Sequence, residues 1–244
     1  MMAFYGEPIP LDEEYRYMLI DAIQEASYLF SEYLKEHNLP TNNGHDGVKW
    51  NFINKQVISK FNSDRFAINV TSRGIWEFIL IFDKVTGFLF TLMRDKNFIN
   101  LQKNADKNLY HYLNALSRYN KDLYKEYIPV YEQGDLFDEI EFEESYYDDL
   151  DKISEKLTRK IELCIKRYAL ITFTEENGQA TKLRCIIPTV GMNYFALENW
   201  SEYIGAQYTF KGMQSGDINS TDSVIADDTE PVLRRKSKAK VVAE

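Results

Sequence analysis

A segment rich in carboxylates is the strongest chemical feature of the sequence. Residues 126–151 contain eleven Asp or Glu residues and no Lys or Arg. The formal charge of the whole chain is -9, so the rest of the chain is close to neutral and the acidity is local. Such a concentration of charge attracts cations and basic partners. The segment can therefore bind a metal ion, dock a partner, or face solvent as an acidic loop.

A metal site is the least supported of these interpretations. A calcium loop needs ligands around a turn with a central glycine, and the acidic run has no glycine after Gly134. Tyr146, Tyr147, Asp148 and Asp149 match the Tyr-x-Asp-Asp string of reverse transcriptases, whose aspartates bind catalytic metal ions. Here both aspartates fall in the predicted first turn of a helix, so we interpret the match as chance. We predict no metal and no cofactor.

Aromatic residues within the acidic segment favour a docking surface, because aromatic side chains often anchor protein interfaces. A sharper form of this hypothesis is a mimic of nucleic-acid phosphates that occupies a basic groove of its partner. The residues assigned to the protein-binding surface are Glu141, Phe142, Glu143, Glu144, Tyr146, Tyr147, Asp148 and Asp149. Neutralisation within the chain is the plainer hypothesis, because the flanking residues 94–125 and 152–168 carry +4 each.

A basic and aromatic segment precedes the acidic one and suggests a second kind of surface. Its candidate nucleic-acid-binding residues are Arg94, Lys96, Lys103, Lys107, His111 and Arg118. Basic side chains can follow a phosphate backbone while neighbouring aromatic rings stack on bases. The charge sums favour more strongly a solvated helical face that lies beside the acidic segment. Nucleic acid is therefore the alternative partner to a protein.

No catalytic constellation is recognisable. The three histidines, His37, His45 and His111, have no partner at metal-ligand spacing, and the chain has no glycine-rich phosphate loop or nucleophile elbow. Glu77 interrupts an apolar strand, which predicts a buried ion pair first and a functional carboxylate second. An enzyme whose site combines distant residues such as Glu77, His111 and Tyr112 is a third hypothesis.

Hydrophobic spacing predicts the elements that position these residues. Residues 11–35 have the spacing of an amphipathic helix, and a shorter helix follows around Trp50 and Phe61. Residues 66–70, 75–82 and 88–93 are apolar stretches separated by short turns. They predict a three-stranded antiparallel meander.

The second half of the chain predicts helices and a further hairpin. The predicted elements are two helices in residues 94–125, an amphipathic helix in 150–165, strands at 168–174 and 180–187, and a last short helix in 193–204. Asn177 and Gly178 supply the tight turn of that hairpin. We predict one α+β domain over residues 8–208 and a disordered, flexible tail at 209–244, which ends in a basic cluster.

The order of helix, meander, helix and later strands is similar to the core of restriction-type nucleases. That chemistry needs an acidic-x-Lys pair on the third strand, which here has no acidic residue, so such a fold would be inactive.

The chain has no apolar run long enough to span a membrane and no secretory signal, which predicts a cytoplasmic protein without a membrane partner. In that compartment Cys164 and Cys185 are expected to be reduced, buried thiols.

Residues 82–98, together with residues 47–54, carry a resemblance to a known family. The chain resembles, over roughly residues 10–205, a family of uncharacterised bacterial proteins, a domain of unknown function, of which some are associated with mobile elements. The resemblance implies a bacterial cytosolic protein and supplies no catalytic residues.

Our leading hypothesis is a non-enzymatic binding module of the inhibitor, antitoxin or anti-defence type that acts through the acidic-aromatic segment.

Overall fold

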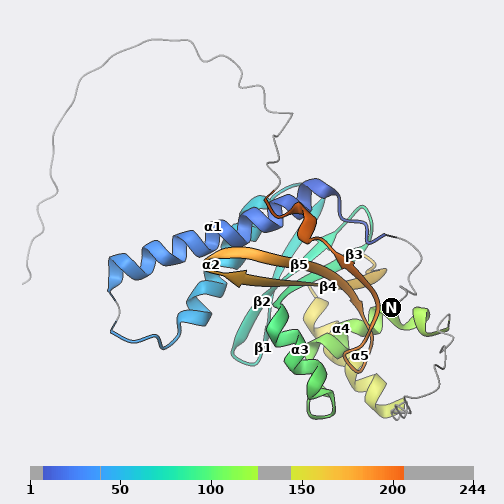
Figure 1. Cartoon of the computed structure of the whole chain (residues 1–244). Helices are drawn as coiled ribbons and strands as arrows, with labels where there is room; N and C mark the ends of the chain where they lie inside the picture. Colours follow the sequence, from blue (N-terminus) through green and yellow to red (C-terminus); the bar gives the residue numbers. More distant parts are fainter. Residues whose placement is uncertain (1–7, 39, 126–143, 206–244) are drawn as a thin grey trace, which may run out of the picture. The chain divides into compact units, whose positions relative to one another are not determined.

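Helices cover both faces of one mixed sheet (Figure 1). The structure, a computed structural model, describes residues 8–38, 40–125 and 144–205. The helices are α1 Glu13–His37, α2 His45–Lys60, α3 Asp95–Lys103, α4 Tyr112–Ser117 and α5 Glu144–Thr158, with short 3-10 helices η1 Ala105–Lys107, η2 Arg118–Lys125 and η3 Ser201–Tyr203. The strands are β1 Phe66–Arg73, β2 Trp76–Asp83, β3 Phe88–Arg94, β4 Arg167–Glu176, β5 Gln179–Pro188 and β6 Tyr194–Asn199.

The six strands lie in the sheet in the order of the sequence. All neighbouring strands are antiparallel except β3 and β4, which are parallel. A parallel pair needs a long crossover, and the segment with α3, α4 and α5 supplies it. The predicted α+β class, the meander and the hairpin at Asn177 and Gly178 are confirmed. The predicted tail and residues 126–143 lie outside the described residues.

The prediction of a last helix in residues 193–204 is wrong. Residues Tyr194–Asn199 form strand β6, which pairs with β5 through contacts such as Ile186 with Leu197. Phe195 and Ala196 are buried on this strand. The free edge of β5 decides the conformation here, because pairing with β5 and packing against the core override the local helical preference of these residues.

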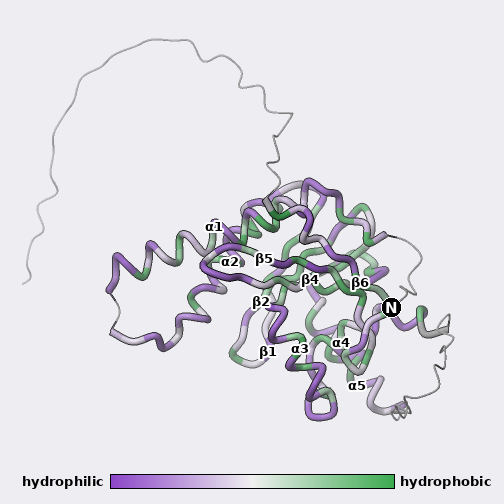
Figure 2. Tube along the Cα trace, in the orientation of Figure 1, coloured by the Kyte–Doolittle hydropathy of each residue, from purple (hydrophilic) through white to green (hydrophobic). Residues whose placement is uncertain are grey.

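The central strands are apolar on both faces because each face is covered by helices. Ile79 and Ile81 of β2 pack in one core with α1 and α2. Phe78, Leu80 and Phe82, which alternate with them, pack in a second core on the side of α3, α4 and α5. In Figure 2 the hydrophobic stretches, drawn in green, run along the strands between these two helical layers. This is the pattern expected of strands that are buried on both sides.

The ladder between β2 and β3 is much shorter than its neighbours. Eight residue pairs join β1 to β2 and seven join β3 to β4, but only Ile81 with Phe90 and Phe82 with Leu89 join β2 to β3. Both pairs lie beside the turn that connects the two strands. From there the β1–β2 hairpin diverges from the rest of the sheet. We call the space between residues 76–80 and residues 91–94 the fork.

An ion pair lies at the joined end of the fork. Asp83 is fully buried, and its Oδ2 accepts a hydrogen bond from Nη2 of Arg65 at 2.7 Å. Its Oδ1 accepts from Nε of Arg65 at 3.1 Å and from the backbone N–H of Val85 at 2.9 Å. Glu77, which we expected to be the buried carboxylate of this strand, is instead exposed. It lies beyond the paired part of the ladder, where β3 no longer covers β2.

Helix α5 ends earlier than its sequence pattern suggests. It stops at Thr158, so Cys164 lies beyond the helix and is exposed, which corrects the expectation of a buried thiol. Cys185 is buried in β5 as expected, and both cysteines are free.

Among the described residues, no helix combines the length and the apolar character that crossing a membrane requires.

Candidate functional site

A cavity of about 340 Å³ lies in the fork. Its walls come from α2, from the end of β1, from β2 and β3, from α3 and from the start of α4. Four aromatic residues line it: Trp50, Trp76, Phe78 and Tyr112. Ligand pockets typically measure about 300–1,000 Å³, so this cavity suits one small ring system rather than an extended ligand.

The aromatic side chains that line the cavity differ in their exposure to solvent. Phe78 and Tyr112 are stacked, with ring centroids 4.5 Å apart and an interplanar angle of 30°. Trp50 is half-buried and packs edge-on against Phe173 at 5.7 Å. Trp76 is 43 % exposed, which places a large flat ring at the boundary between cavity and solvent. The cavity thus offers ring faces on which a planar ligand can stack.

Arg73 contributes a positive charge to the cavity that no described carboxylate neutralises. Six other arginines are held in ion pairs: Arg16, Arg65, Arg94, Arg118, Arg167 and Arg184. Arg73 is exposed and has no such partner among the described residues. None of the described side chains that line the cavity is Asp or Glu. The site therefore favours a ligand with negative charge or with hydrogen-bond acceptors.

His111 adds a neutral hydrogen-bond donor to the cavity. The side chain is 5 % exposed, and its Nδ1 accepts the backbone N–H of Leu113 at 3.2 Å as the N-cap of α4. Burial, reinforced by the charge of Arg73, lowers the pKa of His111 to about 3. The ring is thus neutral at pH 7, and because Nδ1 accepts, the proton is assigned to Nε2. No hydrogen bond between described residues uses Nε2, which is left to serve a ligand.

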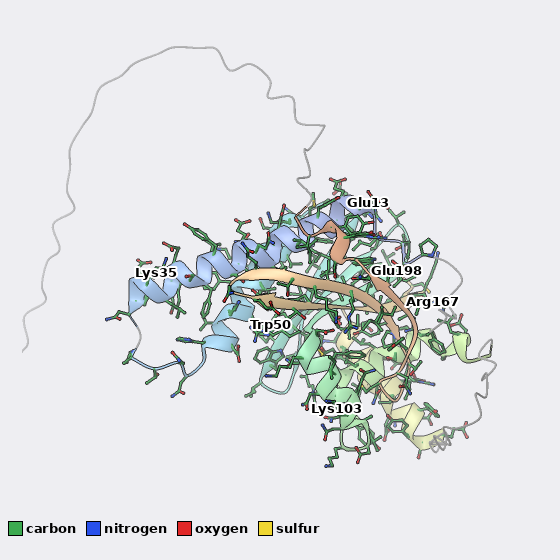
Figure 3. All side chains as sticks on the ribbon, in the orientation of Figure 1. Glu13, Lys35, Trp50, Lys103, Arg167 and Glu198 are labelled. Atoms are coloured by element: carbon green, nitrogen blue, oxygen red, sulfur yellow. The ribbon has the colours of Figure 1, made fainter. Side chains whose placement is uncertain are left out.

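A second pocket, lined partly by charged side chains, continues the cavity along α3. The two pockets share Asn97 and Asn100, and the second is also lined by Lys96 and Lys103. Both lysines are exposed and have no ion-pair partner among the described residues. We call these two lysines the basic shelf, and the cavity together with the shelf the α3 groove. Figure 3 labels Trp50 of α2 and Lys103 at the end of α3.

Asp95 is the single carboxylate in the described lining of the second pocket, and it is already neutralised. It forms ion pairs with Arg184 and with Lys182, whose Nζ lies 3.2 Å from Oδ2. Burial opposes ionisation of Asp95, but the hydrogen bonds and charges of Arg184 and Lys182 outweigh it and lower its pKa. The shelf therefore retains its positive charge.

The structure brings three of the six predicted nucleic-acid-binding residues into the α3 groove: Lys96, Lys103 and His111. Arg94 lies at the border, paired with Asp46 at 2.7 Å and with its Cζ 6.0 Å from the Trp50 ring. Lys107 is exposed on η1, outside the lining of both pockets. Arg118 is engaged elsewhere, paired with Asp151 at 2.8 Å.

The groove residues that sequence reasoning missed include Arg73, Trp76, Asn97 and Asn100. The available clue in the sequence was the apolar pair Ile75 and Trp76 directly after the turn glycine, because neighbouring apolar residues at an exposed turn can mark an interaction site. The asparagines carry no comparable pattern in the sequence.

The acidic-aromatic residues divide into three groups. Glu141, Phe142 and Glu143 lie outside the described residues. Glu144 and Asp148 are exposed on α5, and Asp149 pairs with Lys152 at 2.9 Å. Tyr146 is buried and donates a hydrogen bond to the carbonyl of Leu109 at 2.8 Å, while Tyr147 lies under the guanidinium of Arg118. The described end of the segment is therefore partly neutralised and packed within the chain.

No group of three His, Cys, Asp or Glu side chains is placed to hold a metal ion within residues 8–38, 40–125 and 144–205.

Comparison with known families gives one finding. The profile of a family of unknown function, DUF5986, matches residues 8–241. No curated protein and no solved structure matches the chain.

Proposed function

We propose that the chain, which belongs to the family of unknown function DUF5986, is a non-enzymatic nucleic-acid-binding protein that uses the α3 groove. The observation that carries the proposal is an aromatic cavity joined to a basic shelf by two shared amides, Asn97 and Asn100. A nucleotide unit combines a flat ring, a polar edge and a phosphate. The groove offers a matching stacking face, hydrogen-bonding groups and positive charge along one direction.

The balance of charge supports nucleic acid over a basic partner at this groove. Arg73, Lys96 and Lys103 have no ion pair with described residues, while Asp95 is neutralised by two cations. A positively charged groove with aromatic platforms is the general design of proteins that hold single strands. The predicted cytoplasmic location belongs to this proposal, and the two free cysteines are compatible with a reducing compartment.

Replacing both shelf lysines is expected to weaken binding to a single-stranded oligonucleotide. In the Lys96→Gln, Lys103→Gln variant two phosphate contacts are lost. The slope of log affinity against log salt should become less steep by about 1.4, since each contact to a single strand contributes about 0.7. Fluorescence anisotropy of a labelled oligonucleotide over a range of salt concentrations measures this slope.

The matched control for this experiment is Lys84→Gln, Lys160→Gln, which removes the same charge from exposed lysines outside both pockets. It should keep the slope of the unmodified protein. Equal slopes for the two double variants would exclude the shelf, and absence of binding at low salt would reject the proposed function.

A second candidate function is docking of a protein partner through the acidic-aromatic segment. Glu144 and Asp148 favour it, because they are exposed and four residues apart, on one face of α5. The setting that we propose with it is a bacterial protein, associated with a mobile element, of the inhibitor, antitoxin or anti-defence type.

Glu144→Gln, Asp148→Asn is expected to reduce capture of such a partner several-fold, because charge complementarity guides association. The measurement is affinity purification from the native host followed by mass spectrometry. Glu155→Gln, Glu162→Gln removes two other exposed carboxylates and serves as the control. Partner recovery that is equal in both variants would argue against the acidic surface.

A further inference from the structure

We infer that the fork cavity receives a single unstacked base of a nucleic-acid strand. It selects guanine, thymine or uracil, which have a carbonyl oxygen at C6 of the purine or C4 of the pyrimidine, over adenine and cytosine, which have an amino group there. The inference rests on the proposed function and specifies the ligand of the same groove. It draws on three features: the place and size of the cavity, the aromatic faces around it, and the polar groups that reach into it.

The location of the cavity favours a single strand. The cavity lies between two strands of a sheet, and its volume of about 340 Å³ is small for a ligand site. A base in a duplex is paired and stacked, and must be extruded at a cost in free energy before it can enter such a space. A base in a single strand can enter without that cost. Its phosphates then remain outside, within reach of Lys96 and Lys103, which line the adjoining pocket.

The aromatic residues give the entering base faces to stack on. The stacked pair Phe78 and Tyr112 is buried on the sheet side, and Trp76 stands at the mouth with 43 % of its surface exposed. Every base has a flat face, so stacking by itself does not select among bases. Selection must come from the polar edge.

The polar groups that reach the cavity from β1 and from the start of α4 are donors. The guanidinium of Arg73 has only N–H groups, and Nε2 of the neutral His111 carries a proton because Nδ1 accepts from Leu113. Guanine O6 and uracil or thymine O4 accept hydrogen bonds, whereas adenine N6 and cytosine N4 donate them. The amino group of adenine or cytosine at this position would place a donor against these donors. Asn97 and Asn100 can serve either kind of edge, so the selection falls to Arg73 and His111.

Uracil and cytosine strands give the sharpest test, because the two bases have the same size and differ in the carbonyl or amino group at C4 and the proton at N3. Oligo(dU) is expected to bind about tenfold more tightly than oligo(dC) of the same length, which is the order of discrimination that a good polar contact to a base edge provides. A strand of equal length made of abasic sites keeps the phosphates and should bind more weakly than either. Anisotropy at one fixed salt concentration compares the three strands.

Two variants connect the preference to the cavity. His111→Asn keeps a good N-cap for α4 but removes the Nε2 donor, so the preference for oligo(dU) should fall while salt-dependent binding remains. Arg73→Lys keeps the charge but loses the planar donor fork, and should reduce the preference without changing the salt slope. His37→Asn, at an exposed histidine of α1, is the control and should change neither quantity. Thermal unfolding verifies that each variant is folded.

The outcomes separate the inference from the proposed function. Equal affinity for oligo(dU) and oligo(dC), or undiminished binding of the abasic strand, overturns the base site while leaving a phosphate-binding groove. A preference for oligo(dU) that persists in both the His111 and the Arg73 variant also overturns it. Absence of binding to all three strands at low salt overturns the proposed function together with the inference.

Discussion

Replacing Asp83 by asparagine is expected to lower the free energy of unfolding by about 3 kcal/mol, because removal of one partner of a buried ion pair leaves the charge of the other partner uncompensated. Asp83 is fully buried and both its oxygens accept hydrogen bonds from Arg65. In the Asp83→Asn variant an amide NH₂ takes the place of one oxygen and faces the guanidinium, donor against donor. The value lies at the low end of the range for buried pairs, since the Arg65 side chain keeps 18 % of its surface exposed.

Asp12 provides a control that uses the same arginine. It also forms an ion pair with Arg65, but its side chain is 65 % exposed. Asp12→Asn should therefore cost less than about 1 kcal/mol, as is usual for surface pairs. Urea denaturation of both variants at pH 7 gives the comparison. Similar losses for the two variants would mean that the joined end of the fork does not depend on the burial of Asp83.

The Asp83 pair bears on the site because it lies where β2 and β3 are still joined. Only two residue pairs hold these strands together, and Asp83 follows directly after Phe82, the last paired residue of β2. Beyond them the β1–β2 hairpin has no ladder to β3. The position of Arg73 and Trp76 relative to α3 therefore depends on a short joined end, which the Arg65 ion pair stabilises.

Local patterns were sufficient to predict most of the fold. Apolar stretches separated by short turns predicted the three strands of the meander, and Asn177 with Gly178 predicted a turn whose φ values of 52° and 80° are both positive. β6 could not be recognised in this way, because Phe195 and Leu197 fit a helix or a strand equally. The free edge of β5 determines which of the two forms.

The site could be predicted only in fragments, because its residues come from separate elements. His111 and the shelf lysines lie in one basic segment and could be proposed together. Arg73 and Trp76 reach them only because the hairpin diverges from β3, and the register that produces the fork is a long-range property. The same divergence exposes Glu77, whose burial we expected from the apolar character of the strand around it.

The charge state of His111 predicts a distinct sensitivity to acid. The folded protein keeps this ring neutral down to a pKa of about 3, whereas the unfolded chain binds a proton near the ordinary pKa of 6.5. Below pH 6.5 the unfolded state therefore binds one more proton than the folded state, and acid favours unfolding. The free energy of unfolding should decrease by about 1.4 kcal/mol for each pH unit as the pH falls below about 6.5. This contribution is absent above pH 6.5.

His111→Asn should remove this dependence, while His37→Asn should retain it. The window from about pH 6 to pH 4.5 isolates the effect, because carboxylates titrate near pH 4 and below. Asp95 and Asp151, whose pKa values are lowered by partners that include Arg184 and Arg118, lose their stabilising contribution only at still lower pH. Urea denaturation at several pH values measures the slope. A slope that persists in His111→Asn would assign the acid sensitivity to another group. The cavity would then lose the neutral donor on which the selection of guanine, thymine or uracil depends.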